Sequence, residues 1–122
     1  MKYKIQGITM SITNMQPMLD FYINVFNMTF VEKKINGNYL YSTTWNDLDL
    51  LFCPAELTQV QVNQNRHQID VIVDDIQKVI NFALSHGGQM MGKIVENENS
   101  KSVGIYDPDG NSILFVELDG EI

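Results

Sequence analysis

The stretch 107-DPDGNSILFVEL-118 combines a tight turn with an apolar segment near the end of the chain. Pro108 and Gly110 are residue types that turns favour, one for its fixed and the other for its permissive backbone. The mostly apolar residues that follow predict a strand over 112–118. The acidic residues of 107–111 also suggest a calcium loop, but proline and glycine at turn positions favour a hairpin turn.

Two amphipathic helices are predicted upstream of this hairpin. The first covers 15–26, with Asn14 as its N-cap. The second begins after Asp74 or Asp75 and ends at Gly87-Gly88, because glycine readily adopts the left-handed conformation of a C-cap. The apolar faces consist of Met15, Met18, Leu19, Tyr22 and Phe26 in the first helix, and Ile76, Val79, Ile80, Ala83 and Leu84 in the second.

Strand candidates accompany the helices in the same order in both halves of the chain. They are 7–13, 29–35, 39–44 and 48–52 in the first half, and 68–73, 89–95, 102–106 and 112–118 in the second. A strand–helix–strand–strand–strand unit is therefore predicted twice, with a shift of about 61 residues between Gly7 and Gln68. The halves are 1–56 and 66–119, and the polar segment 57–65 is predicted to link them.

The composition indicates one globular domain and excludes several classes of function. The 122 residues are 44% hydrophobic and 19% charged, which suits a single core. A net charge of −7 repels phosphate backbones, so no nucleic-acid partner is expected. No apolar run approaches the roughly 20 residues of a membrane span, so no membrane partner is expected. Cys53 is the one cysteine, which suits a reducing cytoplasm.

The hairpin at 107–117 resembles the final hairpin of the vicinal-oxygen-chelate superfamily, which includes glyoxalases, bleomycin-resistance proteins and extradiol dioxygenases. Residues 8–22, ending in the Phe-Tyr pair, resemble its first strand and helix, and 73–76 with Gly87-Gly88 resemble the two ends of its second helix. The resemblance spans the chain and implies an α+β fold of two βαβββ modules that form an open, cupped mixed sheet. It also implies a homodimer and, in many members, a divalent metal in the cleft.

The four family positions for metal ligands fall on Gly7, Asp49, Gln68 and Leu114. Glycine and leucine have no donor atom, and glutamine offers a neutral amide, whereas such metals favour carboxylate and imidazole ligands. The residues at these family positions therefore predict a metal-free cleft without a cofactor.

Two nearby residues, His67 and Glu117, could donate to a metal but do not complete this set of ligands. His67 would replace Gln68 only after a one-residue slip, which would turn the strand inside out and bury Asp70. Glu117 lies an odd number of residues from Leu114, so on a regular strand it faces the other side.

Other single residues have a structural and a functional interpretation. Trp45 either stacks on a ligand in the cleft or packs in the core or a dimer interface, and the sequence leaves this open. Cys53 follows an apolar run without a basic neighbour, which favours an inert buried thiol. His86 precedes the glycine pair that ends a helix, where a cation is favourable, so a structural role is expected.

Three functions remain open at this stage. The first is a metal-free, dimeric binding protein of bleomycin-resistance type, with no catalytic residue. Its cleft sequesters a small ligand, and one form of this hypothesis makes the ligand cationic. The expected cleft residues are Gly7, Trp45, Asp49, Gln68 and Leu114. The second is a lyase, isomerase or dioxygenase-related enzyme, with Asp49 as a weak base or an unusual metal site. The third is an interaction subunit with a filled cleft.

Overall fold

Nine strands and three helices make up the part of the chain described by the computed structural model, residues 2, 7–58 and 67–119. The first half contains β1 (Gly7–Ile12), α1 (Met15–Phe26), β2 (Val31–Ile35), β3 (Asn38–Trp45), β4 (Leu48–Pro54) and α2 (Ala55–Thr58). The second half contains β5 (Ile69–Val73), α3 (Ile76–Ser85), β6 (Gln89–Met90), β7 (Val95–Glu96), β8 (Ser100–Tyr106) and β9 (Ser112–Leu118).

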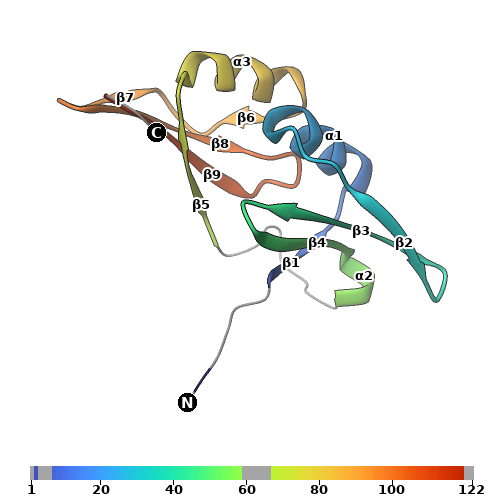
Figure 1. Cartoon of the computed structure of the whole chain (residues 1–122). Coiled ribbons are helices and arrows are strands. Elements are labelled where there is room, and N and C mark those ends of the chain that lie inside the picture. Colours follow the sequence, from blue (N-terminus) through green and yellow to red (C-terminus); the bar gives the residue numbers. More distant parts are fainter. Residues whose placement is uncertain (1, 3–6, 59–66, 120–122) are drawn as a thin grey trace.

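The strands are divided between two mixed sheets, one for each half. The N-terminal sheet has the order β1-β4-β3-β2, and the C-terminal sheet has the order β5-β9-β8-β6, with β7 also paired to β8. In each sheet the first strand of the module runs parallel to the last, and the other pairs are antiparallel. The α+β class and the two βαβββ modules are thus confirmed (Figure 1).

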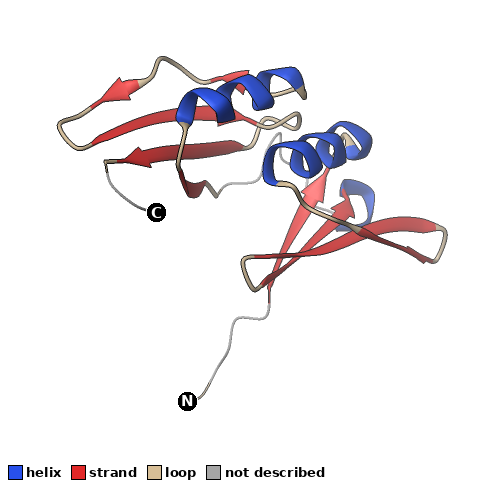
Figure 2. Cartoon of the chain, turned by 45° about the horizontal axis from the view of Figure 1, so that its top comes forward, coloured by secondary structure: helices blue, strands red, loops and turns tan. Residues whose placement is uncertain are grey.

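One hydrophobic core joins the two modules. Helices α1 and α3 lie side by side on one side of the molecule, with a sheet beneath each (Figure 2). The buried cluster contains residues of both sheets and both helices. Across the boundary, the ring of Phe26 on α1 stacks on that of Phe115 on β9, with centroids 5.8 Å apart. Because the cluster includes residues of both modules, each module buries apolar area against the other, which stabilises the fold.

The helices begin and end as predicted, but their caps differ in detail. Asp75 caps α3 by accepting a hydrogen bond from the backbone N–H of Lys78. Glu117 on β9 accepts a second one from the N–H of Ile76, at 2.8 Å. Asn14 occupies the N-cap position of α1, but its side chain does not cap the helix, which corrects that expectation. Its side-chain amide donates instead to Asp109.

The segment 89–95 was expected to be one strand and instead forms β6 and β7. Met90 pairs with Ile105 and Val95 pairs with Ser102, so this chain segment has two residues more than its partner β8. Such an insertion interrupts the ladder as a bulge does. A local pattern does not reveal it, because it depends on the register with another strand.

The expected linker 57–65 begins inside a short helix that was not predicted. Helix α2 follows β4 directly and packs on β1 and β4. Residues 59–66, and with them most of the linker, lie outside the described residues. Within the described part of the chain, no helix is long and apolar enough to span a membrane.

Candidate ligand-binding groove

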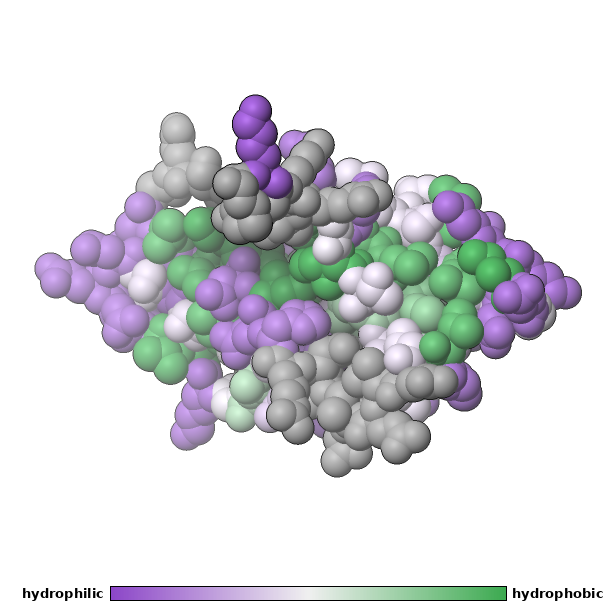
Figure 3. Space-filling view, turned by 90° about the horizontal axis from the view of Figure 1, so that it is seen from below, coloured by the Kyte–Doolittle hydropathy of each residue, from purple (hydrophilic) through white to green (hydrophobic). Residues whose placement is uncertain are grey.

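The N-terminal sheet has an apolar face beneath the helices and a mixed face turned away from them. On β1 and β4, Met10 and Phe52 point into the core, so residues of the other parity point outward. Gly7 pairs with Asp49, and the next pair on the same face is Thr9 and Leu51. Figure 3 looks at the molecule from below, with hydrophobic residues across the middle, a hydrophilic group among them, and further hydrophilic residues at both ends.

A groove of about 1050 Å³ includes much of this outward face. It also reaches residues of core parity, such as Ile8, Leu50 and Trp45, at the edge of the sheet. Its lining comes from β1, β2, β3, β4 and the segment between α1 and β2. The lining residues are Gly7, Ile8, Thr9, Phe26, Asn27, Met28, Thr29, Val31, Lys33, Ser42, Thr43, Thr44, Trp45, Asn46, Asp49, Leu50 and Leu51. The groove therefore combines hydroxyl and amide groups with apolar and aromatic surface.

Two opposite charges lie at different places in the groove. Lys33 and Asp49 are the charged side chains among its described lining residues, and both are exposed. The one ion pair found among the described residues joins His86 and Asp20, so neither charge in the groove is neutralised by a described neighbour. Both charges are thus available to a ligand.

Gly7 is placed so that no side chain fits there. A Cβ atom on Gly7 would lie 2.4 Å from the backbone oxygen of Asp49 and 2.8 Å from its Cβ. These contacts are shorter than atomic packing allows, so the strands would have to separate. This position therefore has no side chain that could bind a metal, and the backbone leaves no room for one.

The other two residues expected in the cleft lie on the C-terminal sheet, away from the described lining of the groove. Leu114 pairs with Asp70, whereas Gly7 pairs with Asp49, so the two modules are offset by two residues from the expected correspondence. Gln68 hydrogen-bonds through its amide to Ser112 and Asp70, at 3.2 and 3.3 Å. The structure thus brings together Gly7, Trp45 and Asp49, and places Gln68 and Leu114 on the other sheet.

These residues do not fit the divalent metal that the fold family implies. Gly7 and Leu114 contribute no donor, and the amide of Gln68 already has partners in its own sheet. Within the described part of the chain, no group of three or more His, Cys, Asp or Glu residues lies close enough to hold a metal ion. Asp49 alone is a weak ligand set for a divalent cation.

The structure shows the surroundings of Trp45 and Cys53, two residues with more than one interpretation. The ring of Trp45 packs edge-on against Tyr22 and Phe26, at 6.0 and 5.0 Å between centroids, and it also lines one end of the groove. Trp45 thus packs in the core, one of the two roles that the sequence left open, and its stacking on a ligand stays a prediction. Cys53 is buried, and burial raises the pKa of its thiol, which disfavours the reactive thiolate.

The predicted hairpin turn also links the two modules by hydrogen bonds to Asp107 and Asp109, and this link is called the latch. The buried carboxylate of Asp107 accepts hydrogen bonds from the hydroxyl of Tyr22, from the backbone and side chain of Asn111, and from the N–H of Asp109. Burial raises the pKa of Tyr22 well above its ordinary value, and the nearby Asp107 raises it further, so the hydroxyl stays a donor.

Asp109 extends this latch to the strand that carries Gly7. Its carboxylate accepts hydrogen bonds from the backbone N–H groups of Thr13 and Asn14, at 2.8 and 2.9 Å. The C-terminal turn therefore holds the junction of β1 and α1. Sequence analysis identified the turn but missed this role, because its partners lie 95 and 96 residues away.

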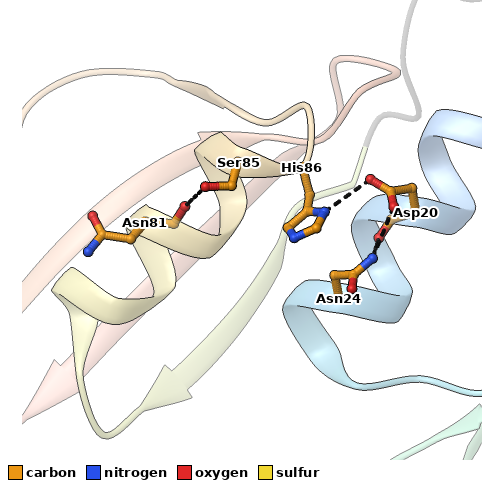
Figure 4. A network of polar contacts seen from close by, with 5 residues as sticks. All are labelled: Asp20, Asn24, Asn81, Ser85 and His86. Carbon is orange, nitrogen blue, oxygen red and sulfur yellow. Dashed lines mark hydrogen bonds and ion pairs between the residues drawn. The ribbon is translucent and has the colours of Figure 1, made fainter.

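A polar contact between the end of α3 and helix α1 also joins the two modules. Nδ1 of His86, at the end of α3, lies 3.1 Å from Oδ2 of Asp20 on α1, and Asn24 donates to the same Asp20 (Figure 4). His86 therefore has a structural position, as expected, although its partner on α1 was not foreseen.

The fold and the sequence together establish the family. The model of the glyoxalase/bleomycin resistance protein/dioxygenase superfamily matches residues 4–115, so the chain belongs to this superfamily. Comparison with curated proteins found no match.

Solved structures with the same fold are similar over nearly their whole length. A glyoxalase-related enzyme from Fulvimarina pelagi has a TM-score of 0.77 at 16% identity, with 97% of this chain and 95% of that chain covered. A family enzyme from Burkholderia phytofirmans PsJN has a TM-score of 0.77 at 15% identity, covering 95% and 99%. Lactoylglutathione lyase from Agrobacterium tumefaciens has a TM-score of 0.65 at 20% identity, covering 95% and 94%.

Proposed function

We propose that this protein is a metal-free binding protein of bleomycin-resistance type, which sequesters a small molecule in the groove of its N-terminal sheet. The observation that carries the proposal is the groove itself, whose lining combines a free carboxylate with hydroxyl groups and aromatic surface. Ligand sites are usually concave and hold a few polar groups among apolar ones. The poor donor set at the family's metal positions favours binding over metal-dependent catalysis.

A cationic group on the ligand is favoured at one end of the groove. Asp49 supplies the negative charge, and it is exposed on the outward face without an ion-pair partner among the described residues. Cations are attracted to carboxylates. Trp45 and Phe26 border the groove from the other face of the sheet, where their rings pack on each other. The net charge of −7 raises the local concentration of cations around the whole molecule.

The experiment is a thermal-shift panel of cationic antibiotics, aromatic metabolites and 2-oxo compounds. A ligand stabilises the protein in proportion to RT ln(1 + [L]/Kd), so a true ligand raises Tm with its concentration. We expect Asp49→Asn to weaken the shift caused by cationic compounds. Asp47→Asn, in the neighbouring turn and outside the groove lining, removes the same charge and should have no effect.

Metal analysis distinguishes this function from that of a metal-dependent lyase or isomerase. Protein purified without chelator should contain far less than one metal ion per chain. About one equivalent, removable by chelator with loss of Tm, would contradict the proposal.

We further propose a homodimer. Ile72 on β5 is half exposed, and Leu114 and Val116 lie on the same face of the C-terminal sheet. Covering this apolar face with a second copy would remove it from water. Light scattering after size exclusion should give twice the mass of the chain, and a monomer at all concentrations would exclude the dimer.

A further inference from the structure

We propose that the groove takes an elongated zwitterion, held at its cationic end by Asp49 and at its anionic end by Lys33. This inference rests on the groove being the ligand site proposed above. It adds a second recognition element and a length to the ligand.

The sheet register places the two charges on one face. Asp49 pairs with Thr44, and Lys33 pairs with Leu40, so both lie on the face of β3 that carries Leu40 and Thr44. Side chains separated by an even number of residues share a face of a strand. Lys34, the next residue on β2, faces the other way, and its ammonium lies 5.4 Å from the ring centre of Tyr39.

The register also sets the distance between the two ends. Four residues along β3 and two strand spacings across the sheet separate Asp49 from Lys33, which places their Cα atoms about 16 Å apart. The lysine side chain is long and flexible, so the two charges can lie about 10–16 Å apart. A ligand that contacts both needs its charges at that separation.

The surface between the two charges suits a polar chain more than a bare hydrocarbon. Thr9, Ser42 and Leu51 form adjacent positions on the outward face between the two ends. Hydroxyl groups there can bond to amide or hydroxyl groups of a ligand. A protein of net charge −7 repels anions in general, so Lys33 provides the local cation that an anionic group requires.

The test uses tetra-alanine, whose extended termini lie about 13 Å apart. Four forms are titrated into ¹⁵N-labelled protein and followed by NMR: free termini, N-acetylated, C-amidated, and blocked at both ends. We expect the form with free termini to shift the amides of Thr9, Ser42 and Leu51. Blocking either end should raise Kd roughly two- to five-fold, as for an ion pair near the surface.

Two variants assign each end of the peptide. Asp49→Asn should abolish the effect of N-acetylation, and Lys33→Gln should abolish the effect of C-amidation, as in a double-mutant cycle. Lys34→Gln and Asp47→Asn are the matched controls, since each removes the same charge nearby but outside the groove lining. In both control variants, N-acetylation and C-amidation of the peptide should still raise Kd.

Three outcomes would overturn the inference. If Lys33→Gln and Lys34→Gln behave alike, Lys33 only protects an edge strand. If Asp49→Asn alone matters, the groove takes simple cations, and the binding function stands without the zwitterion. If neither the peptides nor any compound of the panel shifts the groove amides, the inference and the proposed function fail together.

Discussion

At the scale of the residue, Asp107 is the buried carboxylate that joins the modules, through the hydroxyl of Tyr22. It is 2% exposed, and its carboxylate acts as the acceptor in every hydrogen bond found for it. Burial raises its pKa above the ordinary 3.8, while hydrogen bonds from Asn111, Tyr22 and Asp109 lower it again in part. Because the pKa of Asp107 is higher in the folded protein than in the unfolded chain, the free energy of unfolding depends on pH.

We expect Asp107→Asn to change the pH dependence of unfolding. Because the pKa is raised in the folded state, the folded protein binds more protons at Asp107 than the unfolded chain does above pH 3.8. The contribution of Asp107 to the free energy of unfolding is therefore present at low pH and lost as pH rises through the raised pKa. Asp107→Asn has no such loss, so its stability relative to the original protein should increase with pH across that window.

Urea unfolding at a series of pH values measures this difference. Asp47→Asn, an exposed turn residue, controls for the removal of a charge as such. A stability difference between Asp107→Asn and the original protein that stays constant, or that decreases as pH rises, would contradict the assignment.

At the scale of the element, the pairing of β1 with β4 shapes the groove. These strands are parallel, and they leave no room for a side chain where Gly7 faces Asp49. The strands carry the floor of the groove on one face and core residues such as Met10 and Phe52 on the other. A change in their spacing therefore affects both stability and binding.

We expect Gly7→Ala to destabilise the protein by about 1–3 kcal/mol, because the new methyl group would collide with the backbone of Asp49. The shift of the urea midpoint measures the cost. Gly92→Ala is the control, because a Cβ there has no neighbour within 4 Å. Equal effects of the two substitutions would show that the strands are not closely packed at Gly7.

At the scale of the whole molecule, the two modules share one core. Contacts across the boundary include Phe26 with Phe115, Tyr22 with Asp107, and His86 with Asp20. The last of these is a surface ion pair and contributes little, about 0–1 kcal/mol. Aromatic packing and the buried hydrogen bonds are therefore what makes the modules one folding unit.

We expect a substitution in one module to unfold both. Ile113→Ala removes a fully buried side chain from the C-terminal sheet, at a cost of about 2–5 kcal/mol. Trp45, the one tryptophan, reports on the N-terminal sheet by fluorescence, and far-UV circular dichroism reports on both sheets. The two urea curves should shift together, as in a two-state transition. A second transition seen only by circular dichroism would mean that the modules unfold separately.

The amino-acid sequence by itself determined the doubled module and the order of its elements, apart from α2 and the division of 89–95 into β6 and β7. Apolar spacing of three or four defined α1 and α3, and the turn residues at 107–111 defined the final hairpin. These are local properties, because a helix face or a turn depends on neighbours a few residues away. The bulge between β6 and β7 depends on the register with β8, and no local pattern reports it.

Only the tertiary structure decided which residues share a site. It paired Gly7 with Asp49, placed Lys33 on the same face, and moved Gln68 and Leu114 to the other sheet. It also made Asp107 and Asp109 a latch for residues more than 80 positions earlier in the chain. The physical reason is that strand register and packing bring together distant residues, whereas spacing along the sequence records only which face of its own element each residue occupies.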